Sequence, residues 1–168
     1  RRVTAAIPLA DSVRSPDLWL WLYTARARAL WHLGRRQEAE RDQLRALSLG
    51  ADAAKLYNVA DAYHNLGHVY EGQGRWRDAN RPIDRYVDIA RPMYANLRFS
   101  SLLDAGEMRW KAGWHASARV AFEDMVRVGE ELNENFVYAG EYYERIGDLQ
   151  RARDYHRRAR AEAAGNTA

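Results

Sequence analysis

Residues 65–79 read NLGHVYEGQGRWRDA, and the spacing of the small residues in this stretch decides the fold. Gly74 follows Gly67 by seven residues and precedes Ala79 by five. The same spacing, with alanine or glycine at the first position, occurs around Gly34, Gly113 and Gly147. Successive anchor glycines are 40, 39 and 34 residues apart, which is the period of an array of helical repeats.

Each copy of the spacing predicts two amphipathic helices. In the second copy, residues recur at i, i+3, i+4 and i+7, namely Tyr63, Leu66, Gly67 and Tyr70. This helix is expected to end at Gly74, because glycine readily takes the left-handed conformation that closes a helix. A second helix is expected after it, with Pro82 delaying its start to near Asn80 or kinking it. At the start of the chain, Ser15-Pro16 predicts a helix that begins with proline in its first turn.

The stretch 65–79 resembles the signature of the tetratricopeptide repeat (TPR) family, and the resemblance extends over residues 17–163. It implies an all-α fold of the right-handed α–α superhelix type, a TPR-like solenoid with four helical hairpins and a leading half-repeat. The expected half-repeat and repeats are 1–14, 17–50, 55–91, 97–130 and 133–164, within one domain of a larger, bacterial protein. The chain departs from the family pattern at Arg26, where a leucine-like residue is usual, at Arg109, where an aromatic residue is usual, and at Gln43 and His156, where a large apolar residue is usual.

Composition excludes several classes of function. Lys and Arg total 26 against 23 acidic residues, and the net charge of +3 is too small to indicate general nucleic-acid binding. The absence of Cys excludes disulfides, thiolate catalysis and Cys-based zinc sites. Charged residues interrupt every apolar stretch, so no membrane span is expected. No catalytic signature is present either, because Gly72-Gln-Gly74 does not follow a strand as a phosphate loop would. We therefore expect no enzyme activity, no cofactor and a cytoplasmic location.

The resemblance implies that the first helix of each hairpin lines a concave groove. The groove residues carried over from the family are Trp21, Arg28, Trp31, Asp61, His64, Asn65, His68, Glu71, Asp104, Glu107, Trp110, Tyr138, Glu141 and Glu144. Acids outnumber bases among the groove positions of the last three hairpins, so the groove is expected to be acidic. An acidic concave wall favours a basic partner, and Trp31 and Trp110 would stack on its arginine or proline side chains. In the alternative interpretation, both Trp side chains fill space between hairpins.

These residues predict a protein- or peptide-binding scaffold. Two alternatives remain open from the sequence. In the first, the chain is a sensory or regulatory domain of a larger bacterial signalling or transcription protein. In the second, it is a scaffold that self-assembles into a homo-oligomer through its exposed ends.

His64, His68 and Glu71 lie at i, i+4 and i+7, a spacing that brings two imidazoles and a carboxylate to one face of a helix. A divalent metal would fit such a face, with Asp104 or Glu107 as a further ligand. No supporting motif accompanies the two histidines, so ordinary polar groove residues are the favoured interpretation and no metal is predicted.

Overall fold

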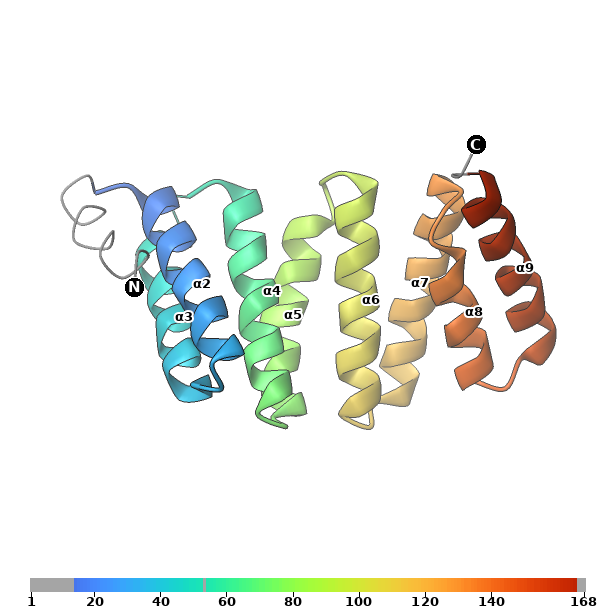
Figure 1. Cartoon of the computed structure of the whole chain (residues 1–168), viewed down its shortest axis with the longest axis horizontal. Helices are drawn as coiled ribbons and strands as arrows, with labels where there is room; N and C mark the ends of the chain where they lie inside the picture. The colour runs from blue at the N-terminus through green and yellow to red at the C-terminus, as the bar shows by residue number, and fades with distance from the viewer. Residues whose placement is uncertain (1–13, 53, 166–168) are drawn as a thin grey trace. The chain divides into compact units, whose positions relative to one another are not determined.

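The computed structural model describes residues 14–52 and 54–165. Within these ranges the chain forms eight helices and no strand (Figure 1). The predicted half-repeat 1–14 lies outside the described residues except for Arg14. The helices form two compact units, the first ending at Pro92 and the second beginning at Met93.

The first unit contains two helical hairpins, made of α2 (Pro16–His32), α3 (Arg36–Gly50), α4 (Leu56–Gly72) and α5 (Trp76–Ala90). α2 packs along α3, α4 packs along α5, and both helices of the first hairpin contact α4. The start of α2 is as predicted, with Pro16 in the first turn and the Ser15 hydroxyl accepting a 3.4 Å hydrogen bond from the Leu18 N–H.

The second unit also contains two hairpins, made of α6 (Ala95–Lys111), α7 (His115–Leu132), α8 (Phe136–Arg145) and α9 (Leu149–Gly165). α7 contacts α8 and joins the two hairpins. The core of this unit is built around Phe122, which is 1% exposed and stacks on Tyr142 with ring centroids 5.0 Å apart.

The four anchor glycines close the first helix of each hairpin, as the sequence predicts. Their φ angles are positive, between +73° and +83°, at Gly34, Gly74, Gly113 and Gly147. After each glycine, the next N–H donates back to a carbonyl five residues earlier, as in the 2.9 Å bond from Arg75 N to Tyr70 O. This is the hydrogen-bond pattern of a glycine-terminated helix, and it fixes the tight turn into the second helix.

The small residues found in the sequence lie where the two helices of a hairpin cross. An added Cβ at Gly67 would lie 2.5 Å from Ile83, and one at Gly106 would lie 2.5 Å from Phe122. Gly140 meets the ring of His156 at the same distance. Each opposing residue stands nine positions after the anchor glycine, so close approach of the helices follows from the repeat itself.

The prediction for Pro82 is wrong in one respect. α5 begins at Trp76 and runs through Pro82, rather than starting near Asn80. The Asn80 side chain does not cap a helix start, because its Nδ2 donates to the Trp76 carbonyl at 2.8 Å. Packing explains the difference: Pro82 is buried beside Ile83, so tertiary contacts hold the helix across the missing N–H.

Glu130 joins α7 to α9 in the second unit. It accepts hydrogen bonds from Arg158 Nη2 at 2.8 Å and from the Tyr155 hydroxyl at 2.7 Å. The bond from Arg158 lowers the pKa of Glu130, and the bond from Tyr155 adds to the effect. Burial in turn raises the pKa of the Tyr155 hydroxyl. Because the folded-state pKa of Glu130 lies below its unfolded value, its contribution to stability is present above about pH 4.3 and is lost as pH falls through the folded value.

We therefore predict that Glu130→Gln lowers the free energy of unfolding at pH 7 by about 0.5 kcal/mol, and that the difference from wild type is smaller at pH 3. The side chains of Glu130 and Arg158 are each 40% exposed, so solvent screening keeps the effect small. Urea unfolding at both pH values measures it. Asp88→Asn is the control, because Asp88 pairs with Arg91 on one exposed helix face and should change stability less. A difference that persists unchanged at pH 3 would contradict the assignment.

Candidate functional site

A pocket of about 210 Å³ lies between α2 and α4, and we call it the α2–α4 pocket. Its lining comprises Ala27, Arg28, Trp31, His32, Gln43, Asn65, His68 and Val69. The structure thus brings together four of the groove residues predicted from the sequence, Arg28, Trp31, Asn65 and His68. Most of the lining surface is apolar, and its charged member is Arg28.

Trp31 forms one wall of the α2–α4 pocket and also packs between hairpins. Its indole lies so close to Gly72 that an added Cβ there would overlap the ring, at 1.5 Å from Cη2. The Arg36 guanidinium also lies over this ring, 5.3 Å from its centroid. Trp31 therefore has the space-filling role that the alternative interpretation gave it, and it is at the same time accessible from the pocket.

Gln43 is a buried polar residue in the lining, with 0% of its surface exposed. Its Nε2 donates to Thr24 Oγ1 at 3.1 Å and to the Ala62 carbonyl at 2.8 Å. Among the described residues, its Oε1 has no hydrogen-bond partner. Gln43 thus contributes to the lining a buried amide whose nitrogen is satisfied and whose oxygen is not. Sequence reasoning recorded Gln43 only as a departure from the family pattern.

The acids predicted for the groove of the first unit are bonded within α4. Asp61 accepts from Asn65 Nδ2 through both its carbonyl, at 2.6 Å, and its carboxylate, at 3.0 Å. Glu71 lies 2.6 Å from His68 Nδ1. Neither acid lines the α2–α4 pocket, so the chemistry of this pocket is set by Arg28, the imidazoles and the Gln43 amide.

The two histidines of the metal hypothesis do meet. His64 Nε2 and His68 Nε2 are 3.0 Å apart, whereas Glu71 contacts the other ring nitrogen of His68. This geometry gives Glu71 the role of orienting His68 and not that of a third ligand on the same side. Asp104 and Glu107 belong to the second unit. Metal binding by the histidine pair stays a hypothesis.

In the second unit, the predicted groove residues Glu107 and Trp110 contact a cation of the same unit. Arg145 Nη1 lies 2.7 Å from Glu107 Oε1, and the Arg145 guanidinium lies 5.5 Å from the Trp110 ring centroid. The ring of His115 is 4.4 Å from the same indole. A partner that stacks on Trp110 would compete with Arg145, a feature that the sequence did not indicate because Arg145 is 35 residues away.

A second pocket, of about 900 Å³, lies between α8 and α9 and is called the α8–α9 pocket. It brings together the predicted groove residues Tyr138, Glu141 and Glu144, with Glu162 and Arg160 from α9. Glu144 Oε1 lies 3.0 Å from His156 Nε2. The lining is acidic overall, with three Glu against one Arg. Trp21, which is 59% exposed, lies outside this pocket and the α2–α4 pocket.

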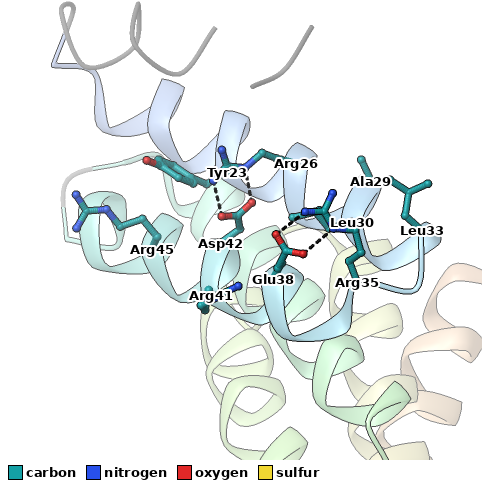
Figure 2. A pocket seen from close by; sticks show the side chains of 10 residues that line it. All are labelled: Tyr23, Arg26, Ala29, Leu30, Leu33, Arg35, Glu38, Arg41, Asp42 and Arg45. Atoms are coloured by element: carbon teal, nitrogen blue, oxygen red, sulfur yellow. Dashed lines mark hydrogen bonds and ion pairs between the residues drawn. The ribbon is translucent and has the colours of Figure 1, made fainter. Parts of the chain in front are cut away.

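A third pocket, of about 740 Å³, lies on the first hairpin and is called the α2–α3 pocket (Figure 2). Figure 2 shows Arg26 paired with Asp42 and Arg35 paired with Glu38, while Arg41 and Arg45 line the pocket from α3 as well. Its apolar part contains Leu33, which is 71% exposed. Sequence reasoning missed this pocket, although it recorded Arg26 as a departure from the family pattern.

Comparison with known proteins identifies the repeat. Residues 20–91 match a family model described as tetratricopeptide repeat. Among solved structures, BtubC (BKLC) from P. vanneervenii is 20% identical with a TM-score of 0.75, and the match covers 90% of this chain and 66%, just under two thirds, of BtubC. A putative kinesin light chain with TPR-like repeats from Podosopora anserina is 17% identical with a TM-score of 0.77, covering 98% and 85%. MamA is 17% identical with a TM-score of 0.69, covering 98% and 88%.

These likenesses confirm the predicted fold class, an all-α solenoid of the TPR type. A search of curated proteins gave no match. In the described part of the chain, none of the helices is long and apolar enough to cross a membrane.

Proposed function

Because residues 20–91 match the tetratricopeptide repeat family model, we propose that this chain is a protein-binding module that receives a partner side chain in the α2–α4 pocket. Repeats of this family generally mediate protein–protein interaction. The observation that carries the proposal is the buried Gln43 amide, whose oxygen lacks a partner among the described residues and lies beside predicted groove residues. Proteins of this type are typically non-enzymatic, and we propose no catalytic role.

The lining of the α2–α4 pocket defines the chemistry of its occupant. A side chain that donates an N–H to Gln43 Oε1 would satisfy a buried acceptor, and leaving such an acceptor unpaired costs about 1–3 kcal/mol. Arg28 disfavours a cationic occupant by like-charge repulsion. A neutral side chain with a flat polar end, such as a carboxamide, therefore fits this pocket best, with Trp31 covering its apolar part.

The predicted basic partner is retained as a proposal for the α8–α9 pocket only. Glu141, Glu144 and Glu162 there would attract basic side chains of a partner segment, and Tyr138 would provide apolar contact. The acids at positions 61, 71 and 107 lie outside the lining of this pocket, so we assign them no part in this attraction.

A displayed library of random peptides tests the proposal for the α2–α4 pocket. Peptides selected on the wild-type chain should bind Trp31→Ala and Arg28→Glu at least tenfold more weakly, as measured by fluorescence anisotropy, because each change removes part of the lining. Trp21→Ala is the matched control, since it removes an exposed indole from the same helix outside the pocket. It should change the Kd less than twofold.

Arg28→Glu keeps this experiment decisive if Trp31→Ala disturbs folding, because Arg28 is exposed and its loss does not open the core. The proposal would be overturned if the selected peptides bind both variants with the same Kd as wild type, or if the library yields no binder.

A further inference from the structure

Two residues of the α2–α3 pocket stand at positions whose equivalents in the second hairpin contact the first hairpin. In the second hairpin, Gln73 and Arg75 both bond to Glu40 of α3, at 2.9 Å and 3.0 Å. The residues forty positions earlier are Leu33 and Arg35, and both line the α2–α3 pocket. Leu33 and Arg35 of the first hairpin therefore stand at hairpin-docking positions to which the described residues bring no further hairpin, and Arg41 and Arg45 lie beside them in the same pocket.

The α8–α9 pocket lies on the face of the last described hairpin that corresponds to the receiving face of the first hairpin. Glu141, Glu144 and His156 stand 113 positions after Arg28, Trp31 and Gln43. In the first unit, those three earlier residues line the α2–α4 pocket, on the side of the hairpin that receives the next one. The last described hairpin thus presents the face that would receive a following hairpin.

The two faces are complementary in charge. The α2–α3 pocket is basic, because Asp42 and Glu38 are matched by Arg26 and Arg35 while Arg41 and Arg45 are in excess. The α8–α9 pocket has three Glu against one Arg. Exposed Leu33 on one face and Tyr138 on the other add apolar surface to both.

We propose that these two faces bind each other between copies of the chain, so that the α2–α3 pocket of one copy docks head to tail on the α8–α9 pocket of the next. Such a contact is heterologous, since different surfaces meet, and it leaves each copy able to bind two others. The inference rests on the proposed function of the α8–α9 pocket as a receiver of basic side chains, and it names a second copy as their source.

The competing occupant of the basic face is the predicted half-repeat 1–14. Its sequence, RRVTAAIPLADSVR, has one acid against three arginines and offers little to match Arg41 and Arg45. A second copy offers three Glu in one pocket, so charge complementarity favours self-association.

Charge exchange between the two faces tests the proposal by sedimentation velocity over a hundredfold range of concentration. Wild type should form larger species as concentration rises, and added salt should weaken them. Arg41→Glu with Arg45→Glu, or Glu141→Arg with Glu144→Arg, should each weaken association at least tenfold. Mixing the two double variants should restore it, because both faces of the first variant are then acidic and both faces of the second are basic. Arg81→Glu with Arg85→Glu is the matched control, at exposed positions forty residues later that line neither pocket.

A wild type that stays monomeric at every concentration would overturn the inference, and so would association that survives both double variants or is not restored by mixing. The proposed function is tested separately, by binding of an oligo-arginine peptide, and it fails if wild type does not bind that peptide. If Glu141→Arg with Glu144→Arg abolishes binding of an oligo-arginine peptide while wild type is a monomer, the acidic pocket receives basic partners but not a second copy.

Discussion

Gly106→Ala is expected to lower the free energy of unfolding by about 2 kcal/mol, although alanine is the better helix former. The added Cβ would lie 2.5 Å, 2.6 Å and 2.8 Å from three ring atoms of Phe122. That ring cannot yield easily, because it is 1% exposed and stacked on Tyr142. Overpacking of this kind costs about 1–3 kcal/mol, which exceeds the gain of about 0.5–1 kcal/mol from replacing glycine within a helix.

Urea unfolding measures this effect, and a second variant isolates its cause. In a Phe122→Leu background the smaller side chain leaves room, so Gly106→Ala should cost less than about 0.5 kcal/mol there. Ala27→Gly in the first hairpin is the matched control, because Ala27 opposes Gln43 at the corresponding crossing. It should cost about 1–2 kcal/mol, from the helix propensity of glycine and the loss of one buried methyl group, with no overpacking. A neutral or stabilising Gly106→Ala would contradict the close approach of α6 and α7.

The repeat spacing predicted the architecture because the backbone of a helical hairpin requires particular residue types at these positions. A left-handed residue must end the first helix, and small residues must stand where two helices cross. Whether that small residue is alanine or glycine was not apparent from the spacing alone. It depends on the residue opposite, which is Gln43 in the first hairpin and Phe122 in the third. The effect of Pro82 was misjudged for a related reason, since burial beside Ile83 overrides its local preference.

The candidate site was predictable only in part. Family register brought Arg28, Trp31, Asn65 and His68 to one pocket, because residues three or four apart share a helix face. Counting charges along the same register could not show which acidic side chains are hydrogen-bonded or ion-paired to neighbouring residues. The contact of Glu107 with Arg145 joins residues 38 positions apart on different helices, and the direction of the Gln43 amide depends on Thr24 and Ala62. Two departures from the family pattern, Arg26 and Gln43, also lie in pocket linings.

Gly72→Ala is expected to lower the free energy of unfolding by about 2 kcal/mol, because the added methyl group would overlap a single side chain, that of Trp31. The added Cβ would lie 1.5 Å, 2.4 Å and 2.6 Å from atoms of the Trp31 indole, so the indole must leave its place between the hairpins. Leaving also removes its contact with Arg36 and its packing beside Val69. Trp31→Ala alone should cost about 2 kcal/mol, because a large, half-buried side chain is lost.

The double variant separates steric overlap from any backbone effect. In a Trp31→Ala background, Gly72→Ala should be neutral within about 0.5 kcal/mol, which gives a coupling energy of about 2 kcal/mol between the two positions in urea unfolding. Gly34→Ala is the control, since its φ is +74° and nothing lies within 4 Å of the added Cβ. Its cost of about 1 kcal/mol comes from backbone strain and should be the same in both backgrounds. If Gly72→Ala also costs the same in both, Trp31 does not lie over Gly72, and the wall of the α2–α4 pocket must be assigned to other residues.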